Sequence, residues 1–135
     1  MSFDIGSDAW NLHVSNMGLI RLKGLASAYG WEWIYVDPAA EGLDPEEIEL
    51  VKTGCLIMPE NARSIADALE RALPNIPEEV TVEEMLVRLR SRRTMQPEYP
   101  VEKLAELLAS WSGEWGRDAI RRGIEIFRGG MVEIC

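Results

Sequence analysis

The sequence predicts an α+β fold: a mostly helical single domain with a small sheet formed by short terminal strands. Apolar residues recur at helical spacing along most of the chain, whereas short segments of alternating apolar and polar residues lie near its two ends. The 135 residues, 47% of them hydrophobic, suffice to build one core. We therefore expect residues 1–135 to form one globular domain whose sheet brings the two ends of the chain together.

Strand candidates lie at both ends of the chain. Phe3 to Ile5 and Trp10 to Val14 show the partial alternation that is typical of short strands. Met131 to Cys135 is a third candidate, which would pair with the first two. Trp31 to Val36 alternates in the same way, and it is either a further strand or an aromatic loop. The order of the strands does not follow from the sequence.

Six helices are expected, because each apolar stripe is bounded by capping residues, prolines or glycines. They run from Asn16 to Gly30, from Pro45 to Gly54, from Pro59 to Pro74, from Val82 into an arginine-rich turn, from Val101 to Gly113 and from Trp115 to Gly129. The link from Cys55 to Met58 is expected to be apolar, and Thr94 to Pro100 is expected to be an exposed connection.

Two of these helix starts are especially well defined. Asp44 is placed to be an N-cap, and Pro45 follows at the first helical position, where its fixed φ is already helical. Two glutamates come next and favour the positive end of the helix dipole. Thr81 and Glu84 form the pattern of a capping box for the fourth helix.

Charge is distributed unevenly along the chain. Residues 32–85 hold fourteen Asp/Glu and three Lys/Arg, whereas residues 86–135 hold seven and nine. The net charge of −9 disfavours nonspecific binding to nucleic acids or anionic membranes, because phosphate contacts depend on Lys and Arg, and it favours a basic protein partner. No apolar run could span a bilayer and the first ten residues lack a signal-peptide pattern, so the cytoplasm is the expected location.

Residues with catalytic or metal-binding chemistry are few. His13, the only histidine, has no partner defined by the sequence, and we expect a structural or solvent-facing role for it. Cys55 stands beside Leu56 and Ile57 and is expected to be a buried small apolar residue. The carboxylates between Asp37 and Glu47 lack the spacing of a calcium loop. We predict no catalytic residue, no metal and no cofactor.

Acidic residues near the second and fourth helix starts are the candidate partner-binding residues. A carboxylate in the first turn stabilises a helix by about 0.3–1 kcal/mol, which explains only some of these residues. The others are expected to form a binding surface, to which two Trp side chains would add aromatic anchors. The alternative for at least one Trp is membership of the core. The candidates are Asp44, Glu46, Glu47, Glu78, Glu79, Glu83, Glu84, Trp31 and Trp33.

Three blocks of the sequence resemble short hypothetical bacterial proteins of unknown function. They are Asn16 to Leu19, Asn61 to Glu70 and Phe127 to Gly130. Helix-forming and turn residues carry the resemblance, which implies no catalytic residue.

Charge and composition together favour a non-catalytic, acidic protein-binding module that engages a basic protein partner, as small immunity proteins and inhibitors do by electrostatic complementarity. That comparison is one of charge and size, not of motif. A small enzyme or ligand-binding domain, whose site is assembled from dispersed residues, is the first alternative. A homo-oligomeric structural protein is the second.

Overall fold

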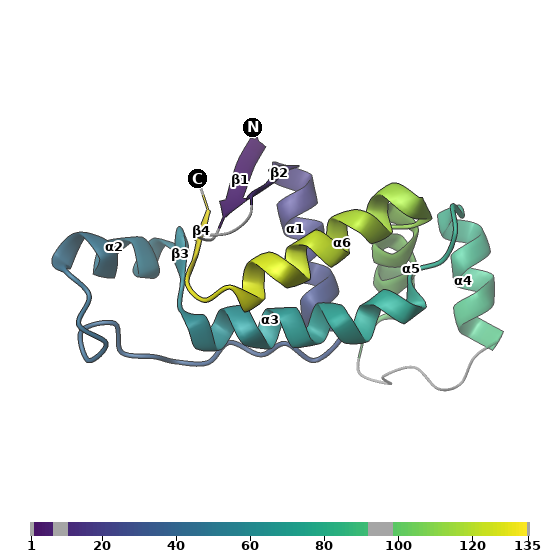
Figure 1. Cartoon of the computed structure of the whole chain (residues 1–135). Coiled ribbons are helices and arrows are strands. Elements are labelled where there is room, and N and C mark those ends of the chain that lie inside the picture. Colours follow the sequence, from purple (N-terminus) through teal and green to yellow (C-terminus); the bar gives the residue numbers. More distant parts are fainter. Residues whose placement is uncertain (1, 7–10, 92–98, 135) are drawn as a thin grey trace.

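A computed structural model describes residues 2–6, 11–91 and 99–134 and confirms the α+β, mostly helical fold. Figure 1 shows the arrangement of its elements. In chain order they are β1 (Ser2–Gly6), β2 (Asn11–Ser15), α1 (Asn16–Ala28), α2 (Pro45–Thr53), β3 (Leu56–Ile57), α3 (Pro59–Ala72), the 3₁₀ turn η1 (Leu73–Asn75), α4 (Val82–Ser91), α5 (Val101–Ser110), α6 (Gly113–Arg128) and β4 (Val132–Ile134). The expected connection from Thr94 to Pro100 lies mostly outside the described residues.

The sheet joins the two ends of the chain, as the sequence predicted. Its strand order is β2-β1-β4-β3, and all of its pairs are antiparallel. Ile5 of β1 lies opposite Ile134 of β4, so the first and last strands are direct neighbours. Strand β3 was not predicted. Its two residues, Leu56 and Ile57, are both buried and show no alternation, and its partner strand is at the far end of the chain.

The core lies between the long helices, and α3 is at its centre. This helix packs against α6 on one side and α1 on another, while α5 packs against both α1 and α4. Figure 1 shows α3 and α6 running side by side. The stripe that the sequence predicted for α3 is buried, with Ile65 and Leu69 almost fully removed from solvent. Within the described residues, no helix is long and apolar enough to cross a membrane.

The segment from Trp31 to Val36 is the aromatic loop of the two alternatives. It has an extended course but no strand partner among the described residues. It belongs to the connection between α1 and α2, which runs along the outer side of α3 in Figure 1. An isolated extended segment leaves its backbone groups without a ladder, so side chains have to satisfy those that are buried.

Candidate functional site

The loop of residues 31–36, here called the aromatic segment, presents large apolar side chains to solvent. Trp33 is 56% exposed and Tyr35 is 81% exposed, and Ile34 between them is also exposed. Trp31 is half-buried and packs against the core, so the two Trp side chains have different surroundings. Their rings meet edge to face, with centroids 6.4 Å apart and an angle of 71° between the planes. Trp31 therefore supports Trp33 from the core side.

A buried side chain holds the middle of the aromatic segment. Asn61, in the first turn of α3, is fully buried. Its Oδ1 accepts a hydrogen bond from the backbone N–H of Ile34 at 2.8 Å, and its Nδ2 donates to the carbonyl of Ile34 at 2.7 Å. A primary amide offers a donor and an acceptor side by side, and it replaces the missing strand here. This role could not be predicted from the sequence, because Asn61 lies within a helical pattern.

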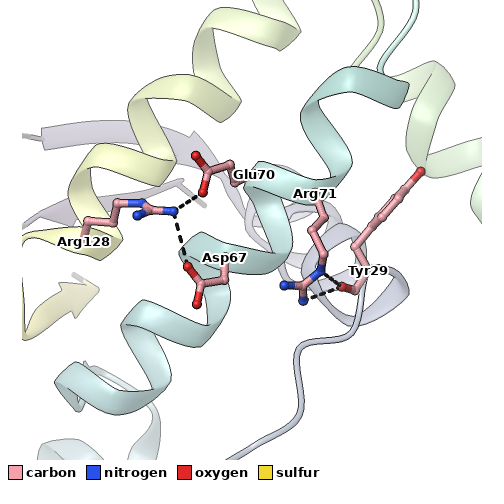
Figure 2. Close-up of polar contacts among 5 residues, drawn as sticks. All are labelled: Tyr29, Asp67, Glu70, Arg71 and Arg128. Atoms are coloured by element: carbon pink, nitrogen blue, oxygen red, sulfur yellow. Dashed lines mark hydrogen bonds and ion pairs between the residues drawn. The ribbon is translucent and has the colours of Figure 1, made fainter.

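A second side chain fixes the point where the aromatic segment leaves α1. Arg71 of α3 donates to the carbonyl of Tyr29 through Nε at 2.9 Å and through Nη2 at 2.7 Å. Figure 2 shows the guanidinium directed at this carbonyl. Gly30 follows with a φ of 100°, the left-handed conformation that lets the chain turn away from α1. The chain is thus attached to α3 at Tyr29, just before the aromatic segment, and at Ile34, in its middle.

The aromatic segment, α2 and the start of α3 enclose a shallow pocket of about 220 Å³, here called the aromatic pocket. It is lined by Trp33, Tyr35, Val36, Pro38, Val51, Lys52, Met58 and Asn61. Of the candidates named from the sequence, only Trp33 lies in this lining. The other lining residues could not be predicted from the sequence, because they come from three separate stretches of the chain.

The stretch of chain that supplies most of the aromatic pocket lining is rich in carboxylates. Residues 32–51 hold seven Asp/Glu and no Lys or Arg, and this stretch includes part of the pocket lining. We call residues 32–51 the acidic end. Lys52, which follows this stretch and lines the aromatic pocket, has its Nζ 3.6 Å from Glu49 Oε1 in an exposed ion pair.

Some carboxylates of the acidic end are engaged in helix capping. Asp44 accepts the N–H of Glu47 at 2.8 Å, and the Glu47 side chain accepts the N–H of Asp44 at 3.2 Å, which completes a capping box. This confirms the predicted N-cap and assigns these two residues a structural role. Glu46 and Glu41 are exposed, and no hydrogen bond or ion pair occupies them within the described part of the chain. Their charges are available to a partner.

The remaining acidic candidates lie elsewhere. Glu78 and Glu79 precede α4, and Glu83 and Glu84 are in its first turn, where Thr81 Oγ1 accepts the N–H of Glu84 at 3.2 Å. Figure 1 places α2 and α4 at opposite ends of the molecule. The structure therefore divides the predicted acidic residues into two groups, and only the group at α2 adjoins the aromatic pocket.

Two further carboxylates, on α3, form ion pairs within the protein. Arg128, at the end of α6, donates to Asp67 at 3.3 Å and also binds Glu70, both on α3. Figure 2 shows the three side chains pointing toward one another across the two helices. These carboxylates face a neighbouring cation, so they are less available to a partner than those of the acidic end.

His13 and Cys55, the residues considered for catalytic chemistry, lie outside the lining of the aromatic pocket. His13 lies opposite Asp4 in the pairing of β2 with β1. Cys55 is a free thiol and half-buried rather than fully buried as expected, because it stands at the edge of the sheet just before β3. Among the described residues, no three His, Cys, Asp or Glu side chains are grouped so that they could hold a metal ion.

Comparison of the chain with protein-family models, with curated proteins and with solved structures found no match.

Proposed function

We propose that this protein is a non-catalytic binding module of the cytoplasm whose acidic end and aromatic pocket engage a basic segment of a partner protein. The observation that carries the proposal is an exposed aromatic pocket on a fixed backbone, five of whose lining residues belong to the acidic end, a stretch with seven carboxylates and no cation. Lys52 is the one charged residue of the lining itself. A partner segment with one apolar side chain and flanking Lys or Arg would match both features. The apolar side chain would enter the pocket, and the cations would meet the carboxylates.

The aromatic residues and the carboxylates of the proposed site are expected to contribute to binding in different ways. Aromatic anchors in desolvated pockets account for most of the binding energy, whereas exposed charges mainly raise the association rate and select the partner. Trp33 and Tyr35 are therefore the expected anchors, and Glu41 and Glu46 are the expected steering charges. Because Asn61 and Arg71 hold the aromatic segment in place before binding, little ordering entropy is lost when a partner docks.

The test is a selection of peptides from a display library on the purified protein. The expected sequences carry Lys or Arg around one apolar residue. Trp33→Ala should lower the affinity for the selected peptide by roughly tenfold or more, as for an interface hot spot. Trp115→Ala is the matched control, because Trp115 on α6 is 77% exposed and lies outside the pocket lining.

Charge reversal at the two ends separates this site from a general effect of net charge. The double variant Glu41→Lys/Glu46→Lys should slow association and reduce its dependence on salt. The double variant Glu83→Lys/Glu84→Lys changes the net charge equally at α4 and should have a much smaller effect. Equal effects of the two variants, or selected peptides without a basic bias, would refute the proposal.

A further inference from the structure

A second pocket lies on a different part of the molecule, between α1 and α5, and we call it the α1–α5 pocket. Its volume is about 280 Å³. It is lined by Ile20, Arg21 and Gly24 of α1, by Lys103, Glu106 and Leu107 of α5, and by Tyr99, which precedes α5. None of these residues belongs to the acidic end or to the aromatic pocket.

The inner surface of the α1–α5 pocket is apolar. Gly24 has no side chain, and a Cβ at this position would lie only 3.2 Å from Leu107 Cδ2, so the glycine lets Leu107 lie against α1. Tyr99 packs against the core, and Ile20 is 55% exposed at the side of the pocket. The exposed isoleucine and the concave apolar surface beside it form an apolar surface that a ligand can contact.

The rim of the same pocket is cationic, although the chain as a whole has a net negative charge. Arg21 and Lys103 are both exposed, and neither forms an ion pair with any side chain that the structure describes. Glu106 is the one carboxylate of the lining. Two cations and one anion leave an excess of one positive charge, on a protein whose net charge is −9.

From this arrangement we infer that the α1–α5 pocket binds a small organic carboxylate with an apolar tail. The tail would lie on Leu107, Tyr99 and Ile20, and the carboxylate would lie between Arg21 and Lys103. A guanidinium can bind a carboxylate through two parallel hydrogen bonds, and a lysine ammonium adds a point charge beside it. The volume of the pocket suits a small molecule rather than a folded partner.

Octanoate and octylammonium test this inference, because they share one tail and carry opposite charges. Binding is measured by titration of the intact protein, with NMR resonances of the pocket residues as the readout. Octanoate is expected to perturb residues of α1 and α5, and octylammonium is expected to bind at least about fivefold more weakly, the ratio for one exposed ion pair. Failure of octanoate to perturb these residues, or equal binding of the two compounds, would overturn the inference.

Variants of the rim test the electrostatic part separately. Arg21→Glu/Lys103→Glu should invert the preference between octanoate and octylammonium, whereas Lys23→Glu/Arg122→Glu changes the net charge equally outside the pocket and should preserve it. Glu106→Gln should tighten octanoate binding by about twofold to fivefold, because it removes a like charge beside the ligand. A gain in affinity cannot arise from damage to the fold. Unchanged preference in the first variant would contradict the assignment of Arg21 and Lys103.

Discussion

At the scale of single residues, Asn61 is the side chain on which the candidate site depends most. It is the one buried polar residue among the described side chains, and both of its hydrogen bonds go to the backbone of Ile34. A buried polar group that loses its partner costs about 1–3 kcal/mol. Loss of the two hydrogen bonds between Asn61 and Ile34 should therefore lower both the stability of the fold and the affinity of the candidate site for a partner.

Replacing Asn61 tests this role. Asn61→Asp keeps the acceptor for the Ile34 N–H but sets an oxygen against the Ile34 carbonyl. We expect the free energy of unfolding to fall by about 1–3 kcal/mol and the amide of Ile34 to exchange with solvent faster. Asn75→Asp is the control, because Asn75 is exposed and donates only one long bond of 3.3 Å to the carbonyl of Arg71. Equal effects of the two substitutions on the free energy of unfolding would show that the hydrogen bonds of Asn61 to Ile34 do not stabilise the fold.

Gly116 is a second position with a sharp requirement. It lies in the first turns of α6, and a Cβ there would overlap the carbonyl group of Trp111 and lie 2.9 Å from the Trp111 Cα. Gly116→Ala should therefore destabilise the fold by about 1–3 kcal/mol, as overpacking does. Gly123→Ala, in the same helix, would meet only methyl groups at 3.8 and 3.9 Å, and it should be neutral or stabilising by up to about 1 kcal/mol. Thermal unfolding of both variants distinguishes the two cases.

Tyr29 links stability to pH. Burial raises its pKa from 10.0 to about 12, because the charged phenolate is poorly solvated where the side chain packs against the core. Between these two values the unfolded chain has lost the proton and the folded chain retains it, so stability should fall as the pH rises from 10 toward 12. Tyr29→Phe should lessen the fall. An equal slope of unfolding free energy against pH in both proteins would show that Tyr29 does not contribute.

At the scale of elements, the helices could be predicted because each carries its own start and stop signals. Asp44, Pro45 and Gly54 bound α2 as expected, and Gly54 has the left-handed φ of 82° typical of a helix C-terminus. The sheet was predictable only at the chain ends. β3 has two residues and no pattern of its own, so its pairing with β4 depends on the tertiary fold.

The aromatic segment shows the same limit. Its alternation suits a strand and a loop equally well, and what decides between them is the presence of a neighbouring strand. Here the neighbour is α3, whose Asn61 takes the place of a strand partner for Ile34, while its Arg71 holds Tyr29 just before the segment. Charge and aromatic content could suggest a binding site from the sequence, but the lining of the aromatic pocket could not be assembled without the fold.

At the scale of the whole molecule, the two acidic groups are separated along the long direction of Figure 1, with α2 at one end and α4 at the other. Exposed charges more than about 10 Å apart are largely screened at ordinary ionic strength, so the two ends act separately on a partner. A basic segment that binds at the acidic end gains from the aromatic pocket as well as from charge. Carboxylates support the start of their own helix at both ends, but only those at α2 adjoin the aromatic pocket.

The most direct measurement is amide hydrogen exchange of the intact protein with and without a selected basic peptide. Peptide binding at the proposed site should protect amides of residues 31–38 and α2 and leave those of α4 unchanged. Protection confined to α4, or no protection in residues 31–38 at saturating peptide, would contradict the assignment of partner binding to the acidic end.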